Sequence, residues 1–101
     1  MKPSKSYQES LIKSLKDPVE AVGYLNAALS EGDEKLFLIA LRNVAEARGG
    51  MMKLSHATKL NRANLYKIFS KRGNPEIQTL ANILSSFGLR LAVAPSARHA
   101  A

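Results

Sequence analysis

The fold of this chain is decided by residues 51–70, which read MMKLSHATKLNRANLYKIFS. Apolar and small residues recur at helical spacing on both sides of Asn61, and the spacing is interrupted there. The side-chain oxygen of Asn61 can accept hydrogen bonds from the free amides of the next turn, which makes it a good N-cap for a second helix starting at Arg62. The stretch therefore predicts two short helices that share one apolar seam. The residues of this seam are Leu54, Ala57, Thr58, Leu65, Ile68 and Phe69.

The same stretch fits a helix-turn-helix position by position. Ser55 supplies the small residue that is wanted where the two helices cross closely. The turn position that usually carries Gly holds Lys59, and a left-handed backbone there costs about 1 kcal/mol. An ordinary helical hairpin would show the same apolar pattern, so a second signal is needed. The apolar positions of the motif are filled by Leu54, Leu60, Leu65 and Ile68.

Charge supplies that second signal. Up to Glu34, four Lys face six acidic residues, whereas from Lys35 onward eleven basic residues face two acidic ones, and the chain carries +7 in all. A solvated helix face usually mixes the two signs, while a block of one sign around an exposed helix suits a polyanion. Between Glu46 and Glu76 there is no acidic residue, and the seven cations there are Arg48, Lys53, Lys59, Arg62, Lys67, Lys71 and Arg72.

Length and composition place the chain in a class. With 101 residues it is expected to form one domain over residues 1–93, followed by a disordered tail at residues 94–101. It contains no cysteine, which agrees with a reducing cytoplasm. No apolar run approaches the length of a membrane span, and the polar start of the chain lacks the apolar region of a signal peptide. We therefore expect a cytoplasmic protein that does not span a membrane.

The residues before the motif predict helices that cover its core. A weak amphipathic helix is expected over residues 6–16, and Asp17 followed by Pro18 is typical of a helix start. Asp33 should cap a third helix over residues 34–48, which is apolar nearly all round and must be covered on more than one side. Helices within residues 6–31 would supply that cover. The residues of the second helix expected to face inward are Val19, Val22, Leu25, Ala28 and Leu29.

The residues after the motif predict one more helix and a strand. Asn74 is expected to cap a helix that has Pro75 in its first position and extends to Phe87. The following residues alternate, with Leu89, Leu91 and Val93 on one side, as in a short strand. Such a strand is either an extension or pairs with its equivalent in a second copy, which would make Leu89, Leu91 and Val93 the dimer interface. The fold class expected is an all-α bundle of five to six helices with a short C-terminal strand.

Several pieces of the chain together match a known family. They are Asp17-Pro18, residues 24–29, residues 31–33, residues 36–50, residues 65–67, residues 73–75 and residues 87–91. Through them the span from Tyr7 to Val93 resembles the addiction-module antidote proteins, relatives of the HigA-type antitoxins that carry a lambda-repressor-like (XRE) helix-turn-helix. The resemblance implies a type II antitoxin that binds a RelE-like, mRNA-cleaving toxin and represses its own operon. Lys59 and Ala63 depart from the usual residues of the motif.

The expected contacts with DNA follow from the chemistry of base edges. A recognition helix places its first turn against bases in the major groove, where Arg suits guanine and Asn suits adenine. Arg62 and Asn64 stand in that turn, and Tyr66 and Lys67 follow beside the groove wall. These four residues are the predicted base or groove contacts. The predicted phosphate contacts are Lys53, Lys59, Lys71, Arg72 and Asn74.

Three functions stay open on the sequence. The first is the antitoxin and autorepressor, expected to be a homodimer whose recognition helices lie about 34 Å apart on palindromic double-stranded DNA. The second is a free-standing phage-type or chromosomal repressor without a toxin. The third is a protein-interaction module that has lost DNA binding.

An enzyme is not expected. The chain has no Gly-rich phosphate loop and no catalytic set of His, Asp and Ser or of Cys and His. His56 and His99 have no neighbours in the sequence pattern that would form a metal site, and no cofactor or metal is predicted.

Overall fold

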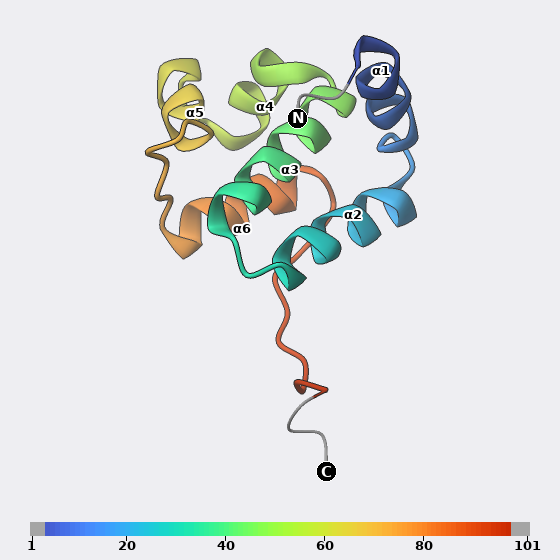
Figure 1. The fold of residues 1–101 in the computed structure, drawn as a ribbon. Helices are drawn as coiled ribbons and strands as arrows, with labels where there is room; N and C mark the ends of the chain where they lie inside the picture. The colour runs from blue at the N-terminus through green and yellow to red at the C-terminus, as the bar shows by residue number, and fades with distance from the viewer. Residues whose placement is uncertain (1–3, 98–101) are drawn as a thin grey trace.

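The computed structural model describes residues 4–97, and these residues form six α-helices around one hydrophobic core (Figure 1). The prediction of an all-α fold is confirmed, with α3 in the middle of the molecule. Within residues 4–97, no helix is long and apolar enough to cross a membrane. The helices are α1 (Lys5–Ser14), α2 (Pro18–Ser30), α3 (Glu34–Ala47), α4 (Gly50–Thr58), α5 (Arg62–Ile68) and α6 (Ile77–Ser86).

The helix starts of α2 and α3 lie where the sequence predicts them. The Asp17 carboxylate accepts from the Val19 amide at 2.9 Å, with Pro18 in the first turn. The Asp33 carboxylate accepts from the amides of Lys35 and Leu36 at 2.9 and 3.3 Å. In each case a carboxylate pairs with amides that the helix itself leaves free, which stabilises the start of the helix.

The first helix lies close to its predicted position but starts one residue earlier and ends two residues sooner. It buries none of its own residues, and the first fully buried side chain among residues 4–97 is that of Leu15, directly after it. A line of polar contacts attaches α1 to its neighbours: the Gln8 amide donates to Asn43 at 3.0 Å, and the Asn43 amide donates to the Tyr24 hydroxyl at 2.8 Å. Both α1 and α2 pack against α3, which confirms their expected role as its cover.

The face of α2 that packs against α3 agrees only in part with the prediction, because Leu25 and Ala28 are buried as expected. Ala21 and Leu25 are buried, whereas Val19, Val22 and Leu29 are exposed by 78%, 41% and 52%. The buried residues of α2 follow helical spacing and include two alanines, Ala21 and Ala28. Small side chains let two helices approach closely, and this contact leaves the larger aliphatic residues outside. The prediction for Val19, Val22 and Leu29 was therefore wrong.

The connection to α6 also differs from the prediction. Helix α6 begins at Ile77 and has Glu76 as its N-cap, so the assignment of Asn74 as cap and Pro75 as first residue was wrong. The chain from Gly73 to Glu76 is irregular and bridges the distance between the end of α5 and the start of α6 (Figure 1). A Cβ on Gly73 would overlap the Ile68 carbonyl, so this turn requires glycine.

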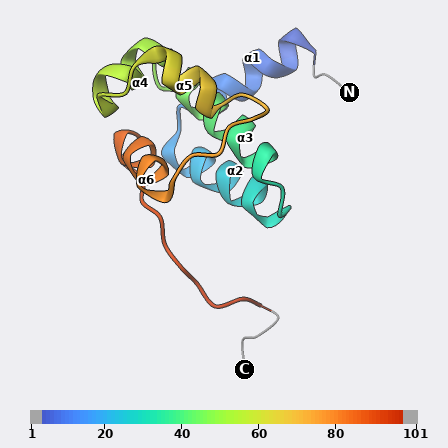
Figure 2. The same cartoon turned by 90° about the vertical axis from the view of Figure 1, so that its left-hand side faces the viewer.

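The predicted C-terminal strand is not seen. Residues 89–96 form neither helix nor strand, and the described residues contain no strand that could pair with them. A strand needs a neighbour to satisfy its main chain, and a single copy does not offer one. The segment leaves the body at the end opposite α4 and α5 (Figures 1 and 2). Of the predicted disordered tail, residues 98–101 lie outside the described residues, and disorder stays a prediction.

Candidate nucleic-acid interface

The turn between α4 and α5 is held by hydrogen bonds inside the motif. Lys59 has φ 64°, which confirms the left-handed conformation that the sequence predicts there. The Thr58 hydroxyl donates to the Leu54 carbonyl at 2.7 Å and accepts from the Leu60 amide at 3.3 Å. The Ser55 hydroxyl donates to the Leu60 carbonyl. Because these polar groups are paired within the turn, the relative orientation of the two helices is well defined.

Helix α5 is capped and anchored as predicted. The Asn61 side chain accepts from the Asn64 amide at 2.7 Å. Leu65 and Ile68 are buried in the core. From α6, the Asn82 amide donates to the Thr58 carbonyl at 3.0 Å, which ties the motif to the rest of the bundle. These contacts fix which side of α5 faces outward.

The outward side of α5 carries all four predicted base or groove contacts. Arg62 and Asn64 are exposed in its first turn, and Tyr66 and Lys67 are exposed in its second. Ala63, which departs from the usual residues of the motif, is exposed as well. The helix therefore presents a guanidinium, an amide, a phenol and an ammonium group to its surroundings, all from one short element.

Two of these side chains border a notch of about 200 Å³ between α5 and the start of α6. Asn64 and Lys67 form one wall, and Arg72 and Asn74 from the connector line it as well. The notch is also lined by Glu76, the acidic residue that ends the cationic stretch of the sequence. A carboxylate repels anions, so a phosphate at the notch would bind on the side of Arg72 and Lys67, away from Glu76.

The five predicted phosphate contacts do not form one site. Lys71, Arg72 and Asn74 are exposed together in the connector after α5. Lys59 borders a separate open hollow with His56. Lys53 lies at the start of α4, where it borders a small cavity. The structure thus distributes these groups over three places around the motif.

Arg48 was counted among the seven cations around the motif, but it points inward. One of its guanidinium nitrogens donates to the Phe87 carbonyl at 3.4 Å. Its other two nitrogens are buried without a hydrogen-bond partner in the part of the chain that the structure describes. Arg48 therefore joins the end of α3 to the end of α6 and adds little to the exposed positive surface.

Arg42 is a cation near the motif that sequence reasoning missed. It is exposed on α3, and its guanidinium carbon lies 5.8 Å from the centre of the Tyr66 ring. A cation at this distance over an aromatic face is attracted to it. The contact joins residues far apart in the chain, so no local pattern could have indicated it. Arg42 extends the positive surface of α5 onto α3 and contacts the Tyr66 ring.

The fold and the site define the class of this protein: a small all-helical protein in which two short helices joined by a tight turn expose a polar, cationic helix face. The chain belongs to the family of probable addiction module antidote proteins, whose sequence model matches residues 7–95. It is also similar to an uncharacterized protein of Haemophilus influenzae, with 34% identity over 73 residues that cover 72% of this chain and 74% of that protein. No solved structure matches the chain.

Membership of this family supports an antitoxin, and with it a toxin partner of some kind. Within residues 4–97, no group of three or more His, Asp or Glu side chains is placed to hold a metal ion.

Proposed function

We propose that the chain is a sequence-specific DNA-binding antitoxin of a type II toxin–antitoxin module. In this proposal it has a lambda-repressor-like (XRE) fold, acts in the cytoplasm as a homodimer, represses its own operon and neutralises a RelE-like, mRNA-cleaving toxin. The observation that carries the DNA-binding part is the orientation of α5. Its apolar residues Leu65 and Ile68 are buried, while Arg62, Asn64 and Lys67 are all exposed.

The chemistry of these side chains favours reading of bases in the major groove. An arginine can donate two hydrogen bonds to guanine, and an asparagine can pair with both the donor and the acceptor of adenine. Arg62 and Asn64 stand in the first turn of α5, the part of a recognition helix that approaches base edges. Tyr66 and Lys67 lie one turn further, within reach of the groove wall.

The three cationic places around the motif favour contacts with phosphates on both sides of the groove. One protomer can place about three to five cations on phosphates, and specific operators usually need about six to ten contacts. Two protomers meet this number, and a two-fold homodimer implies a palindromic operator. Lys53, Lys59, Lys71, Arg72 and Asn74 are the groups proposed to hold the phosphates.

A footprint and gel-shift titration on the DNA upstream of the gene, at two salt concentrations, tests this part. Removing Arg62 or Asn64 by alanine should cost about 1–3 kcal/mol of binding free energy per lost bidentate contact, or about 5- to 150-fold in affinity. Lys71→Ala, at a proposed phosphate contact, should weaken binding to all sequences and reduce the salt slope by about one. Lys16→Ala, which removes an exposed cation far from α5 in the sequence, is the matched control and should change neither. Equal loss with Lys16→Ala would contradict base reading by α5.

The toxin-binding part rests on the family and on the charge of the N-terminal half. Six acidic residues precede Lys35, and Glu9, Glu20 and Glu31 among them are exposed. A basic toxin would be attracted to exposed carboxylates such as these. Deleting α1 and α2 would be a poor test of toxin binding, because α2 supplies buried residues of the core. Reversing the charges of Glu9, Glu20 and Glu31 to Lys should instead abolish co-purification of the protein encoded beside this chain and leave DNA binding intact. Glu46→Lys, which reverses an exposed carboxylate on α3, is the control.

Simple observations distinguish two alternative functions from the proposed antitoxin. A free-standing phage-type or chromosomal repressor would bind the same kind of operator, but no small, basic, RelE-like reading frame would lie beside its gene. A protein-interaction module that has lost DNA binding would give no gel shift with its own promoter.

A further inference from the structure

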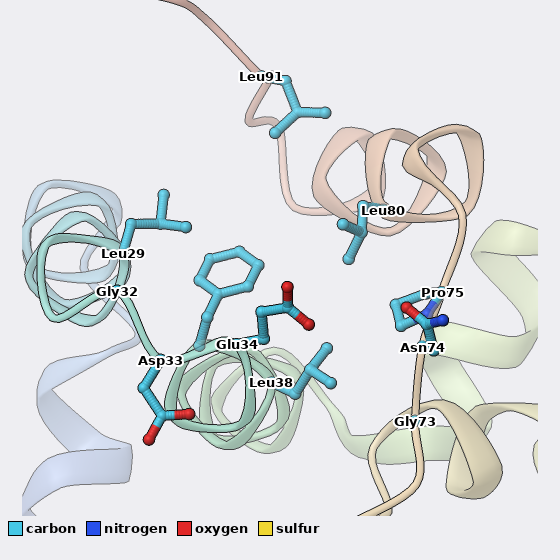
Figure 3. Close-up of a pocket in the computed structure, with 11 residues that line it drawn as sticks. Leu29, Gly32, Asp33, Glu34, Leu38, Gly73, Asn74, Pro75, Leu80 and Leu91 are labelled. Carbon is cyan, nitrogen blue, oxygen red and sulfur yellow. The ribbon is translucent and has the colours of Figure 1, made fainter.

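An apolar hollow lies beside the C-terminal segment and has no occupant from the described residues. This hollow, groove A, encloses about 390 Å³ between the end of α2, the start of α3, the connector before α6 and the segment itself (Figure 3). Five of its eleven lining residues are aliphatic or aromatic, and the lining also includes Asp33 and Glu34. Figure 3 shows Leu29 and Leu80 on two sides of the hollow, Leu91 above it, and the Glu34 carboxylate directed into it. The aliphatic and aromatic residues that line groove A are Leu29, Phe37, Leu38, Leu80 and Leu91.

The C-terminal segment, residues 89–96, borders a different hollow on each of its two sides. Residues 88–92 form a continuous wall of a second hollow of about 400 Å³ on the side of α2 and the end of α6. To groove A the segment contributes only Leu91. Groove A therefore leaves room for another extended chain between the segment and residues 73–75. Leu29 and Phe37 border both hollows, so the apolar surface is continuous under the segment.

The main chain of residues 90–93 forms no backbone hydrogen bond with the described part of the chain. The Leu89 amide donates to the Leu84 carbonyl at 2.9 Å, and from there to Val93 no backbone hydrogen bond forms among the described residues. The apolar side chains become steadily more exposed: Leu89 packs against the core, Leu91 is 39% exposed, and Val93 is 102% exposed. A segment with free amides, free carbonyls and apolar residues at every second position is a template for strand pairing.

We propose that residues 89–93 pair in antiparallel fashion with the same residues of a second copy, centred on Leu91, and that the added strand covers groove A. This deepens the homodimer of the proposed function and rests on it. The bounds of the pairing follow from the sequence. Gly88 has φ 77° and ends the extended stretch on one side, and Pro95 has no amide hydrogen to donate on the other.

The second copy is the occupant because the segment is complementary to itself. In an antiparallel pair centred on Leu91, the two Leu91 side chains lie directly opposite each other, and each Leu89 lies opposite a Val93. All three apolar residues of both strands then share one face, and that face covers groove A. Val93, which none of the described residues covers, gains apolar neighbours in this arrangement. Arg90 and Ala92 lie on the opposite face.

The mass of the protein in solution, without DNA, tests the pairing. The chain has a mass of 11.0 kDa, so light scattering or sedimentation should give a particle of twice this mass. Val93→Asp should weaken self-association at least about tenfold, because it buries an unpaired charge in the pair. Val93 is fully exposed in the protomer, so this change leaves the fold intact. Ala94→Asp places the same charge one residue further on the outward face and should leave the dimer unchanged. A monomeric wild type, or equal effects of the two variants, would overturn the proposal.

Single cysteines test the register, since the chain has none of its own. With Leu91→Cys, the two thiols meet at the two-fold axis, where facing Cα atoms come within the range that a disulfide spans. With Val93→Cys, each thiol faces Leu89 of the second copy. Mild oxidation should therefore crosslink Leu91→Cys at least about tenfold faster than Val93→Cys. Exposure alone predicts the reverse order, because Val93 is the more exposed residue. The reverse order would overturn the register.

These outcomes are separate from those of the DNA experiments. A protein that stays monomeric and still protects its operator refutes the paired segment and leaves DNA binding standing. A protein that dimerises through Val93 and gives no footprint refutes DNA binding and leaves the paired segment standing. If Val93→Asp abolishes binding of the toxin and the wild type alone is monomeric, groove A binds the toxin, and the proposal of a second copy is wrong.

Discussion

The two ends of this molecule differ in what they expose. At the end with α4 and α5, the apolar residues Leu54 and Leu65 are buried, the turn is internally hydrogen-bonded, and mostly polar groups face outward. At the end with the C-terminal segment, Leu29 and Val93 are exposed, and the main chain of residues 90–93 makes no backbone hydrogen bond to the described residues. The end with α4 and α5 has its apolar residues covered within one protomer, and its outward groups suit a polyanion. The second end leaves apolar surface uncovered and suits a protein partner.

The largest expected difference between the two ends is in stability. Leu65 is fully buried in α5, so Leu65→Ala should lower the free energy of unfolding by about 2–5 kcal/mol. Leu29→Ala removes a half-exposed side chain at the other end and should cost less than about 1 kcal/mol in a monomer. Urea unfolding of both variants in the Val93→Asp background, where association does not contribute, measures the difference. Equal losses of unfolding free energy in the two variants would mean that groove A is as well packed as the motif. This result would contradict the proposed difference between the two ends.

The end with the motif could be predicted from sequence because its signals are local. The caps Asp17, Asp33 and Asn61 act on amides two or three residues away, and each one caps the predicted helix. The outward side of α5 followed from the spacing of Leu65 and Ile68.

The other end could not be predicted in the same way because its structure depends on contacts between distant elements. The periodicity of α2 allowed more than one inward face, and the close approach to α3 selected the one with alanines. The alternation at Leu89, Leu91 and Val93 was visible, but a strand forms only with a partner, and one chain does not supply it. Arg42 reaches Tyr66 across the fold, so nothing near either residue indicated their contact.

A smaller effect concerns backbone strain at the motif. Lys59 has φ 64°, a conformation that glycine adopts freely, so Lys59→Gly should stabilise the protein by up to about 1 kcal/mol. Lys67→Gly removes the same side chain from within α5 and should destabilise it by about 1 kcal/mol. For a domain of this size, each change corresponds to about 4–8 °C in melting temperature. Thermal unfolding followed by circular dichroism measures both variants. Destabilisation by Lys59→Gly would show that the Lys59 side chain makes a contact that outweighs the strain.

The smallest expected effect is the contact between Arg42 and Tyr66. An exposed cation over an aromatic ring contributes about 0.5–1 kcal/mol. A double-mutant cycle of Arg42→Ala and Tyr66→Leu, measured by urea unfolding, isolates this coupling from the separate cost of each change. The same four proteins can be titrated with operator DNA. If Arg42 acts by restraining Tyr66, Arg42→Ala weakens operator binding in the presence of Tyr66 and has no effect on the Tyr66→Leu protein. If Arg42 contacts a phosphate directly, its loss weakens binding equally in both backgrounds, and the role of Arg42 as a restraint on α5 is wrong.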